Sequence, residues 1–441
     1  MTDTDQTNLE AADESDKTPW VMREPAERAE GEEANNPIGL LVLLGLLGFL
    51  WYAASFRHLL FVFGLIIMVA LHELGHFMTA RWTGMKASQF FIGFGPRIWS
   101  MRRGETEYGL RAIPAGAFVR IHGMNNLDPV DDPVDAPRAY MNKSYPRRML
   151  VITAGSMMHF IQAVLLFVFA FSVLGTVDPD SEWEISLISG VDLLEDSTVT
   201  REVPAVEAGL QPGDRIVTVD GVDTSVFADL RDYVQARPGR DVVLSIEKAD
   251  GSLVEVVSTL TSVPAQDDPD TEVGFLGIRP SFADRERAGP WVGIKEFGLA
   301  MKTGITTIPS FFAPDRLANL GNLVFQGSED VALTSDEAAE RPISLVGAVR
   351  IAGNEDFDWF APIAFLGFIN VFVGLVNLVP LMPLDGGHAA IATYERIRSI
   401  RRDRPYQADV AKLLPLTYGV VALLAFLFLS TVWLDIVRPI G

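Results

Sequence analysis

Two histidines and a glutamate are the residues in this sequence whose types and spacing best suit chemistry. His72 and His76 are four residues apart, so on a helix they lie one turn apart on the same face. Imidazoles placed in this way can bind one zinc ion, and the neighbouring Glu73 can take a proton from a water molecule on the metal. With only 6 histidines in 441 residues, this spacing predicts a zinc hydrolase site. The alternative is a structural histidine pair inside a helix bundle.

The segment that carries this motif is long and apolar enough to span a bilayer, because residues 59–69 before it are almost wholly apolar. Ionisable groups inside such a segment are costly to bury, and this favours a functional site within the membrane. A soluble zinc protease domain anchored by helices would need polar neighbours around His72. The flanking residues are instead apolar: Leu71, Leu74, Phe77 and Met78.

The composition indicates an integral membrane protein, since 49% of the residues are apolar and the mean hydropathy is +0.22. The net charge of −21 argues against nucleic acid as a partner. The sequence has no cysteine, which excludes disulfides, a thiol nucleophile and a thiolate metal site.

About five membrane spans are predicted, which makes the chain a multi-pass α-helical membrane protein. They cover residues 37–55, 59–80, 149–175, 360–384 and 413–434. Between the second and third spans, glycine, aromatic and β-branched residues around 90–95 and 108–121 predict a β-hairpin. Because this hairpin is so apolar, we expect it to be membrane-associated, and the alternative is an ordinary surface hairpin.

The distribution of charge predicts the orientation of the chain. Residues 81–148 carry 11 basic and 6 acidic residues, and residues 386–411 carry 5 arginines and 3 acids, both of which favour the cytoplasmic side. Residues 176–290 carry 24 acidic and 9 basic residues, which fits the extracytoplasmic side. With the N-terminus inside, the His72–His76 motif and Asp385 arrive at a similar depth near the cytoplasmic face.

The chain divides into six predicted segments. They are a disordered acidic tail (1–36), an extra span (37–55), the first half of a membrane core (58–175), a small β-rich domain (176–290), an amphipathic linker at the membrane interface (291–358) and the second half of the core (359–441). Strands are expected at 242–246 and 253–257, helices at 291–312 and 342–352, and a loop at 327–340.

A catalytic zinc ion needs a third protein ligand and an open position for water. Asp385 is the best candidate, because Pro380 and Pro383 break the fourth span just before it and leave a carboxylate at membrane depth. His159 lies inside the third span. It is either a buried histidine with satisfied hydrogen bonds or a neighbour of the site.

Taken together, these motifs resemble the site-2 protease family of intramembrane zinc metalloproteases. The matching pieces are the His72–His76 motif and residues 377–387, which resemble that family's Asn-x-x-Pro…Leu-Asp-Gly motif. Between them, residues 208–221 resemble the core of a bacterial PDZ domain, and residues 116–123 are similar to the family's membrane-associated β-loop. The resemblance covers roughly residues 58–437, with a single inserted PDZ-like domain and an extra first span.

The resemblance implies a role for each matching residue. His72, His76 and Asp385 would bind one zinc ion per chain, and Glu73 would be the general base. Asn377 would lie close to the scissile segment. The hairpin, including Gly116 and Phe118, would offer an edge strand to an unwound substrate. His159 stands where the family often has asparagine, so it either takes over that role in substrate binding or adds a titratable group near the zinc.

The implied function is regulated intramembrane proteolysis in the plasma membrane. The expected substrate is a single-span protein such as an anti-sigma factor, first trimmed by an upstream site-1-type protease. One alternative is a membrane protease that clears signal-peptide remnants. Another is a non-catalytic PDZ-bearing receptor with a vestigial metal motif, and the intact Glu73 speaks against it.

Overall fold

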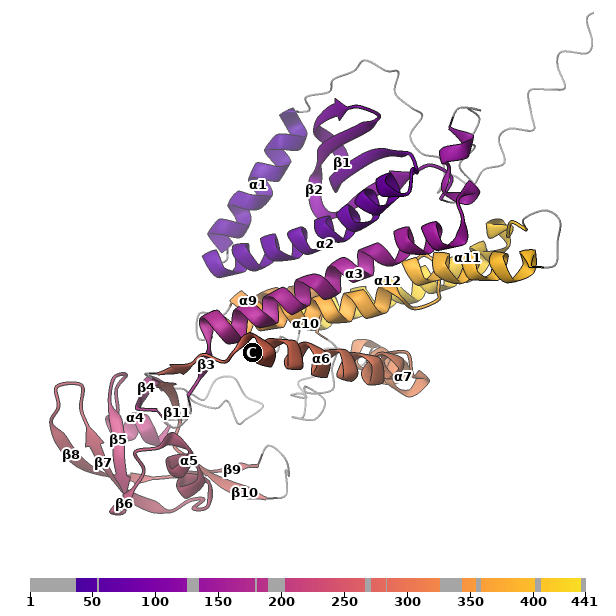
Figure 1. Ribbon diagram of the computed structural model, residues 1–441. Coiled ribbons are helices and arrows are strands. Elements are labelled where there is room, and N and C mark those ends of the chain that lie inside the picture. Colours follow the sequence, from indigo (N-terminus) through magenta and orange to yellow (C-terminus); the bar gives the residue numbers. More distant parts are fainter. Residues whose placement is uncertain are drawn as a thin grey trace, which may run out of the picture.

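The computed structural model describes residues 37–53, 55–124, 135–178, 181–188, 203–265, 271–282, 284–325, 343–353, 358–400 and 406–437. Within these ranges, four helices are long and apolar enough to cross a membrane. They are α2 (Phe56–Trp82), α3 (Tyr145–Phe169) with the π-helical turn that extends it to Leu174, α10 (Phe360–Asn377) and α12 (Leu414–Val437) with the turn that precedes it. Helix α3 packs against both α2 and α10, so it forms the centre of the bundle (Figure 1).

Two of the predicted spans differ from the helices that the structure contains. The segment predicted at 37–55 forms α1 (Pro37–Ala53), which has 17 residues and is not one of the four long helices. The span predicted at 360–384 is helical only to Asn377; the break predicted at Pro380 and Pro383 follows, and a new helix, α11 (Asp385–Ser399), begins after it. The two prolines lack the N–H groups that a continuous helix would need.

The predicted hairpin is present as β1 (Ala87–Arg103) and β2 (Thr106–Ile121). Both strands bend, so that residues 89–92 pair on one side with 107–110 and on the other with 117–120. Within the described residues, no further strand pairs with 117–120, which therefore form an edge. The hairpin lies between α1 and α2 (Figure 1). Phe77 of α2 anchors it through ring contacts with Phe90 and Tyr108 at 5.4 and 5.7 Å between centroids.

A β-rich unit with its own core follows α3. Its elements are β3 (Thr176–Val177), β4 (Trp183–Ile188), α4 (Pro204–Glu207), β5 (Arg215–Val219), β6 (Val222–Asp223), α5 (Phe227–Gln235), β7 (Asp241–Glu247), β8 (Leu253–Thr259), β9 (Thr261–Pro264), β10 (Glu272–Phe275), β11 (Ile278–Phe282) and β12 (Arg285–Glu286). Strands β6, β5, β7 and β8 form an antiparallel sheet in that order, and β7 and β8 contain the two predicted strands. Alternating residues of β7 point into an apolar core that includes Trp183, Leu230 and Leu244.

Helices α6 (Pro290–Phe311), α7 (Pro314–Phe325) and α9 (Leu345–Gly353) connect the β-rich unit to α10. Helix α6 packs against α3 and α10, and α9 packs against α2. The first and last of the three match the helices predicted at 291–312 and 342–352. The predicted tail at 1–36 and the predicted loop at 327–340 lie outside the described residues.

One arginine joins the β-rich unit to the helical bundle. The side chain of Arg285 donates hydrogen bonds to the carbonyl oxygens of Leu174 and Gly175 at the end of α3, at 3.3 and 3.2 Å. It also forms an ion pair with Asp358, whose carboxylate accepts a 2.8 Å hydrogen bond from the backbone N–H of Phe360 at the start of α10. The β-rich unit is thus tied to the ends of two core helices.

Candidate metal centre

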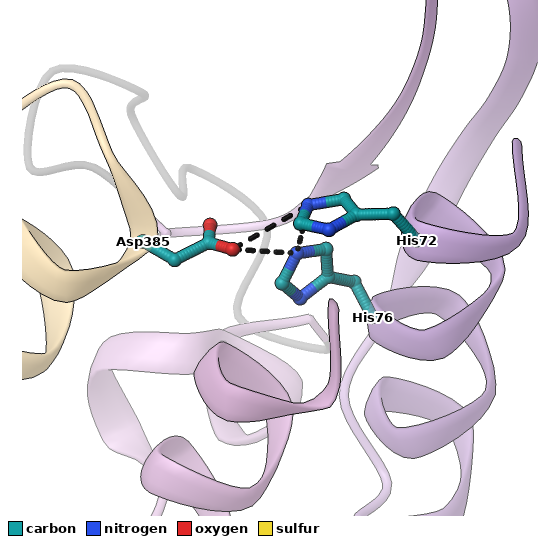
Figure 2. A group of neighbouring side chains, drawn as sticks. All are labelled: His72, His76 and Asp385. Carbon is teal, nitrogen blue, oxygen red and sulfur yellow. Dashed lines mark hydrogen bonds and ion pairs between the residues drawn. The ribbon is translucent and has the colours of Figure 1, made fainter. Parts of the chain in front are cut away.

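Three side chains from two separate helices meet in the bundle (Figure 2). His72 and His76 lie on consecutive turns of α2, and Asp385 is the first residue of α11. The Asp385 Oδ2 atom lies 3.4 Å from His72 Nε2 and 3.3 Å from His76 Nε2, and the two Nε2 atoms are 3.1 Å apart. Both histidines are buried, with 7% and 4% of their surface exposed, so these three atoms face one another away from bulk water.

The orientation of His76 is fixed by the backbone of α3. Its Nδ1 atom lies 2.7 Å from the carbonyl oxygen of Val151, which can only accept a hydrogen bond. The proton of a neutral His76 ring must therefore sit on Nδ1, and Nε2 keeps its lone pair for the centre of the cluster. A backbone carbonyl that holds the far nitrogen in this way is typical of histidines that bind a metal.

Two glycines explain how Asp385 reaches the histidines. A Cβ atom on Gly386 would lie 2.2 Å from the carbonyl oxygen of Val379, and one on Gly387 would lie 2.6 Å from the backbone nitrogen of Met382. The turn after α10 therefore packs directly against the first turn of α11, and only glycine fits there. This close packing places Asp385 at the start of α11, opposite α2.

The donor set fits zinc. Two imidazole nitrogens and one carboxylate oxygen are ligands that zinc accepts, and the three residues form a group that could hold a metal ion. Around a tetrahedral zinc ion with bonds of about 2.0–2.1 Å, neighbouring ligand atoms lie roughly 3.3 Å apart. The separations of 3.1–3.4 Å between the three atoms agree with that value. Asp385 Oδ2 is also buried without a hydrogen-bond donor, a costly arrangement that a cation would relieve.

Helix α3 closes the third side of the centre at Gly155. A Cβ atom at this position would lie 2.4 Å from His76 Nε2 and 2.7 Å from His72 Nε2. Any side chain here would therefore enter the space between the imidazoles. The absence of a side chain at Gly155 keeps that space free for a metal ion or a water molecule.

Glu73 stands between the histidine pair and the hairpin. Its Oε1 atom lies 3.9 Å from His72 Nε2, and its Oε2 atom accepts a 3.0 Å hydrogen bond from the backbone N–H of Val119. Val119 belongs to the edge segment 117–120, so its N–H points away from the rest of the hairpin. The two carboxylate oxygens therefore face different neighbours: Oε1 faces the cluster, and Oε2 faces the edge strand.

The other residues predicted for the site are placed at different points. His159 is 1% exposed, and its ring centroid lies 4.9 Å from that of His72, so it adjoins the cluster. Phe118 lies within the hairpin, where its ring stacks on Phe91 at 5.6 Å, and Gly116 packs against the ring of Phe94. Asn377 is the half-buried last residue of α10 and does not belong to the three-residue cluster.

Comparison with known proteins places this chain among metalloproteases. The sequence profile of Peptidase family M50 matches residues 60–425. The chain is 35% identical to the zinc metalloprotease Rip1 of Mycolicibacterium smegmatis over 414 residues, which cover 87% of this chain and 97% of the relative. It is 32% identical to Rip1 of Mycobacterium tuberculosis over 86% and 97% of the two chains. A putative zinc metalloprotease of Brucella suis is 29% identical over 77% of this chain and 85% of the relative.

This chain belongs to Peptidase family M50, the site-2 protease family, and it is a metalloprotease. The resemblance predicted from the two motifs is therefore confirmed. The apolar helices and the family make it a membrane protein. The relatives are named zinc metalloproteases, which indicates zinc as the metal.

Proposed function

We propose that this protein is an endopeptidase that uses one zinc ion to cut membrane-anchored proteins within the membrane. The observation that carries the proposal is the position of the His72, His76 and Asp385 cluster. It lies where helices with apolar surfaces meet, beside a strand edge and a glutamate. A water-soluble substrate would have to enter the apolar bundle to reach this cluster. A segment embedded in the bilayer already lies at the depth of the cluster.

In this proposal, His72, His76 and Asp385 hold the zinc ion, which supplies a polarised water molecule and a Lewis acid when it is bound. Glu73 is the general base. Its Oε1 atom, which faces the cluster, takes a proton from the water and later delivers it to the leaving nitrogen. The hydrogen bond from Val119 to Oε2 keeps that carboxylate oriented.

The edge segment 117–120 binds the unwound substrate. A transmembrane helix shields its own amides by hydrogen bonding, so it must unwind before hydrolysis. Pairing with an edge strand replaces the lost hydrogen bonds. We assign Gly116, Phe118 and Asn377 to this binding region, with His159 at its metal side.

The finer organisation is part of the same proposal. Helix α1 is a fifth span in the plasma membrane, and the metal centre lies near the cytoplasmic face. The β-rich unit is a PDZ-like domain on the extracytoplasmic side, with the segment boundaries predicted from the sequence.

The substrates are single-span proteins such as anti-sigma factors, cut after an upstream site-1-type protease has removed their outer part. The PDZ-like domain screens them by the size or by the new C-terminus of the remaining outer segment.

Two substitutions test the catalytic roles. Glu73→Gln is expected to leave zinc bound and the fold intact and to abolish cleavage, since the amide cannot take a proton. Asp385→Asn is expected to weaken zinc binding as well, which metal analysis of the purified protein will show. Full cleavage of a membrane-anchored substrate by Glu73→Gln would refute the mechanism.

A comparison of membrane proteomes identifies the substrate class. Cells with the wild-type protein are compared with cells that carry Glu73→Gln, in search of single-span proteins that accumulate with a shortened outer segment. Accumulated anti-sigma factors support the signalling role. Accumulated signal-peptide remnants would assign the protein to membrane clearance instead.

A further inference from the structure

A second polar pair lies beside the metal centre, and it joins two of the long helices. His159 of α3 and Asn370 of α10 are almost completely buried, with 1% and 0% of their surface exposed. The His159 Nδ1 atom lies 3.0 Å from Asn370 Oδ1. The pair is next to the centre, because the His159 ring centroid is 4.9 Å from that of His72.

The hydrogen bonds of Asn370 determine where the proton of His159 sits. Asn370 Nδ2 donates a 2.9 Å hydrogen bond to the carbonyl oxygen of Leu366, so the amide cannot be turned round. The atom that faces His159 is therefore Oδ1, which only accepts. It follows that Nδ1 of a neutral His159 carries the proton, and that Nε2 has a free lone pair.

The ring has little freedom to move away from this position. A Cβ atom on Gly374 of α10 would lie 3.1 Å from the Cβ atom of His159, so the two helices are in close contact there. Since Nδ1 points at α10, Nε2 lies on the other side of the ring. Within the part of the chain that the structure describes, the His159 ring makes one hydrogen bond, and it involves Nδ1 and not Nε2.

Polar groups are expensive inside membrane spans unless they are hydrogen-bonded or serve a function. Asn370 uses both its oxygen and its nitrogen, in bonds to His159 and Leu366, whereas His159 uses only one of its two nitrogens. A side chain that served packing alone would not need a second nitrogen without a partner. The unused lone pair therefore indicates a ligand that is not part of this chain.

We propose that Asn370 is a positioning residue that holds His159 as a hydrogen-bond acceptor for a backbone N–H of the substrate. The inference rests on the proposed function, because it needs an unwound peptide at the metal centre. Unwinding exposes both carbonyl oxygens and N–H groups. Zinc and the donors of the edge strand suit the carbonyl oxygens, and His159 Nε2 suits an N–H group. An asparagine at position 159 would offer a donor as well as an acceptor, whereas this imidazole offers only an acceptor.

The proton position is tested directly by nitrogen NMR of the full-length protein in lipid, labelled with 15N-histidine. The signal of His159 is assigned by its loss in His159→Asn. The expected spectrum has a protonated Nδ1 and an unprotonated Nε2, and this pattern is lost in Asn370→Leu. It is kept in Asn370→Asp, whose carboxylate still accepts from Nδ1. A proton on Nε2 in the wild-type protein would overturn the proposal.

A double-mutant cycle tests whether Asn370 acts through His159. The reporter is a tagged single-span protein that the wild-type protein cuts, and Glu73→Gln is assayed beside it. Asn370→Leu and His159→Phe are each expected to lower the turnover rate about 10- to 100-fold, because the hydrogen bond that His159 makes to the substrate is weakened or lost. The double variant is expected to be no slower than the slower single variant.

The outcomes separate this inference from the proposed function. Multiplied losses in the double variant would show independent structural effects and would contradict the positioning role. The matched control is Gln162→Leu, which also removes side-chain bonds in a span, to the carbonyl oxygens of Met158 at 3.1 Å and Met68 at 3.5 Å. It is expected to change turnover less than about twofold. If Glu73→Gln remains inactive while the cycle is additive, only the role of Asn370 fails. An active Glu73→Gln would remove the proposed function and leave the NMR result standing.

Discussion

The helical bundle and the β-rich unit differ in where their buried polar side chains lie and in what those side chains contact. In the bundle, five deeply buried polar residues lie at or next to the metal centre: His72, His76, Ser156, His159 and Asn370. Others serve structure, such as Asp435, which accepts a 2.8 Å hydrogen bond from the backbone N–H of Ser344 before α9. In the β-rich unit, the buried Asp214 supports a turn, where it accepts a 2.8 Å hydrogen bond from the backbone N–H of Gln211 and pairs with Lys248 at 2.9 Å. Buried polar groups therefore support structure in both regions, and in the bundle a group of them also forms the candidate metal centre.

The two regions also differ in how much of their apolar side-chain surface they bury. The core of the β-rich unit is made of large apolar side chains, such as Trp183, Ile216 and Leu244, and is independent of the bundle. The bundle leaves much of its apolar surface exposed, as expected for helices that face lipid. Substitutions at the polar cluster should therefore affect activity, and substitutions in the β-rich core should affect stability.

The largest effect is expected for Gly155→Leu. The new side chain enters the space between His72 and His76, since even a Cβ atom would lie 2.4 Å from His76 Nε2. Zinc content and cleavage are both expected to be lost, which metal analysis and a cleavage assay will measure. The control is Gly48→Ala in α1, where a Cβ atom would meet nothing within 4 Å. A variant at position 155 that keeps full zinc and activity would show that the metal is bound elsewhere.

The next largest effect is a loss of stability, which we expect to differ between two buried ion pairs. Arg148 of α3 pairs with Glu395 of α11 at 2.7 Å, and both side chains are deeply buried, with 12% and 7% exposed. Arg148→Met leaves Glu395 unpaired, so we expect the free energy of unfolding to fall by about 3–5 kcal/mol. Lys248 is more exposed, at 25%, and Lys248→Met is expected to cost only about 1–2 kcal/mol.

Denaturant titration in mixed micelles measures both losses of stability. The double variant Arg148→Met with Glu395→Leu is expected to recover most of the lost stability, because no unpaired charge then remains buried. Since α11 begins at Asp385, zinc affinity should fall together with stability in Arg148→Met and stay unchanged in Lys248→Met. Equal zinc affinity in both variants would contradict the view that this pair positions α11.

The sequence predicted the residues with rare types at fixed spacings, and it missed the contacts between distant segments. His72, His76 and Asp385 could be found because ionisable residues stand out in apolar spans. The link between His159 and Asn370 could not be predicted, since 211 residues separate them and no spacing in the sequence connects the two.

Contacts that depend on the backbone are even harder to predict from the sequence. The hydrogen bond from Val119 to Glu73 uses a main-chain N–H, which every residue except proline has. The role of Gly155 depends on how closely α3 approaches α2. The fourth span was predicted as too long because apolar residues continue beyond Asn377 although the helix ends there.

A smaller effect is expected when the bond between the hairpin and Glu73 is removed. Val119→Pro lacks the N–H that Glu73 accepts, and the edge strand tolerates proline there because this N–H does not pair with β1. Loss of this orienting hydrogen bond is expected to lower the turnover rate about tenfold, with zinc content unchanged. Val119→Ala keeps the N–H and is the control. Equal rates for both variants would show that Glu73 is oriented by other contacts.

The smallest effect concerns an ion pair at the protein surface, which tethers the hairpin turn to the segment before α3. Glu105 in the hairpin turn accepts two hydrogen bonds from Arg138 at 2.6 Å. These bonds hold the pKa of Glu105 below its ordinary value, against the opposing effect of partial burial. The tether therefore stabilises the fold above the ordinary pKa of glutamate, and this contribution is lost as the pH falls through the lowered pKa. Because the pair is well exposed, we expect only a small contribution, which salt weakens further.

The variant Glu105→Gln isolates this contribution, since its side chain does not titrate. The wild-type protein is expected to melt slightly above the variant at neutral pH, and the difference should vanish in acid and shrink in high salt. Thermal unfolding of the two proteins over a series of pH values measures this difference. The zinc content of the variant should match that of the wild type, because the tether does not touch the metal centre. A difference that persisted in acid would mean that Glu105 acts through packing, as residues of the β-rich core do, and not through its charge.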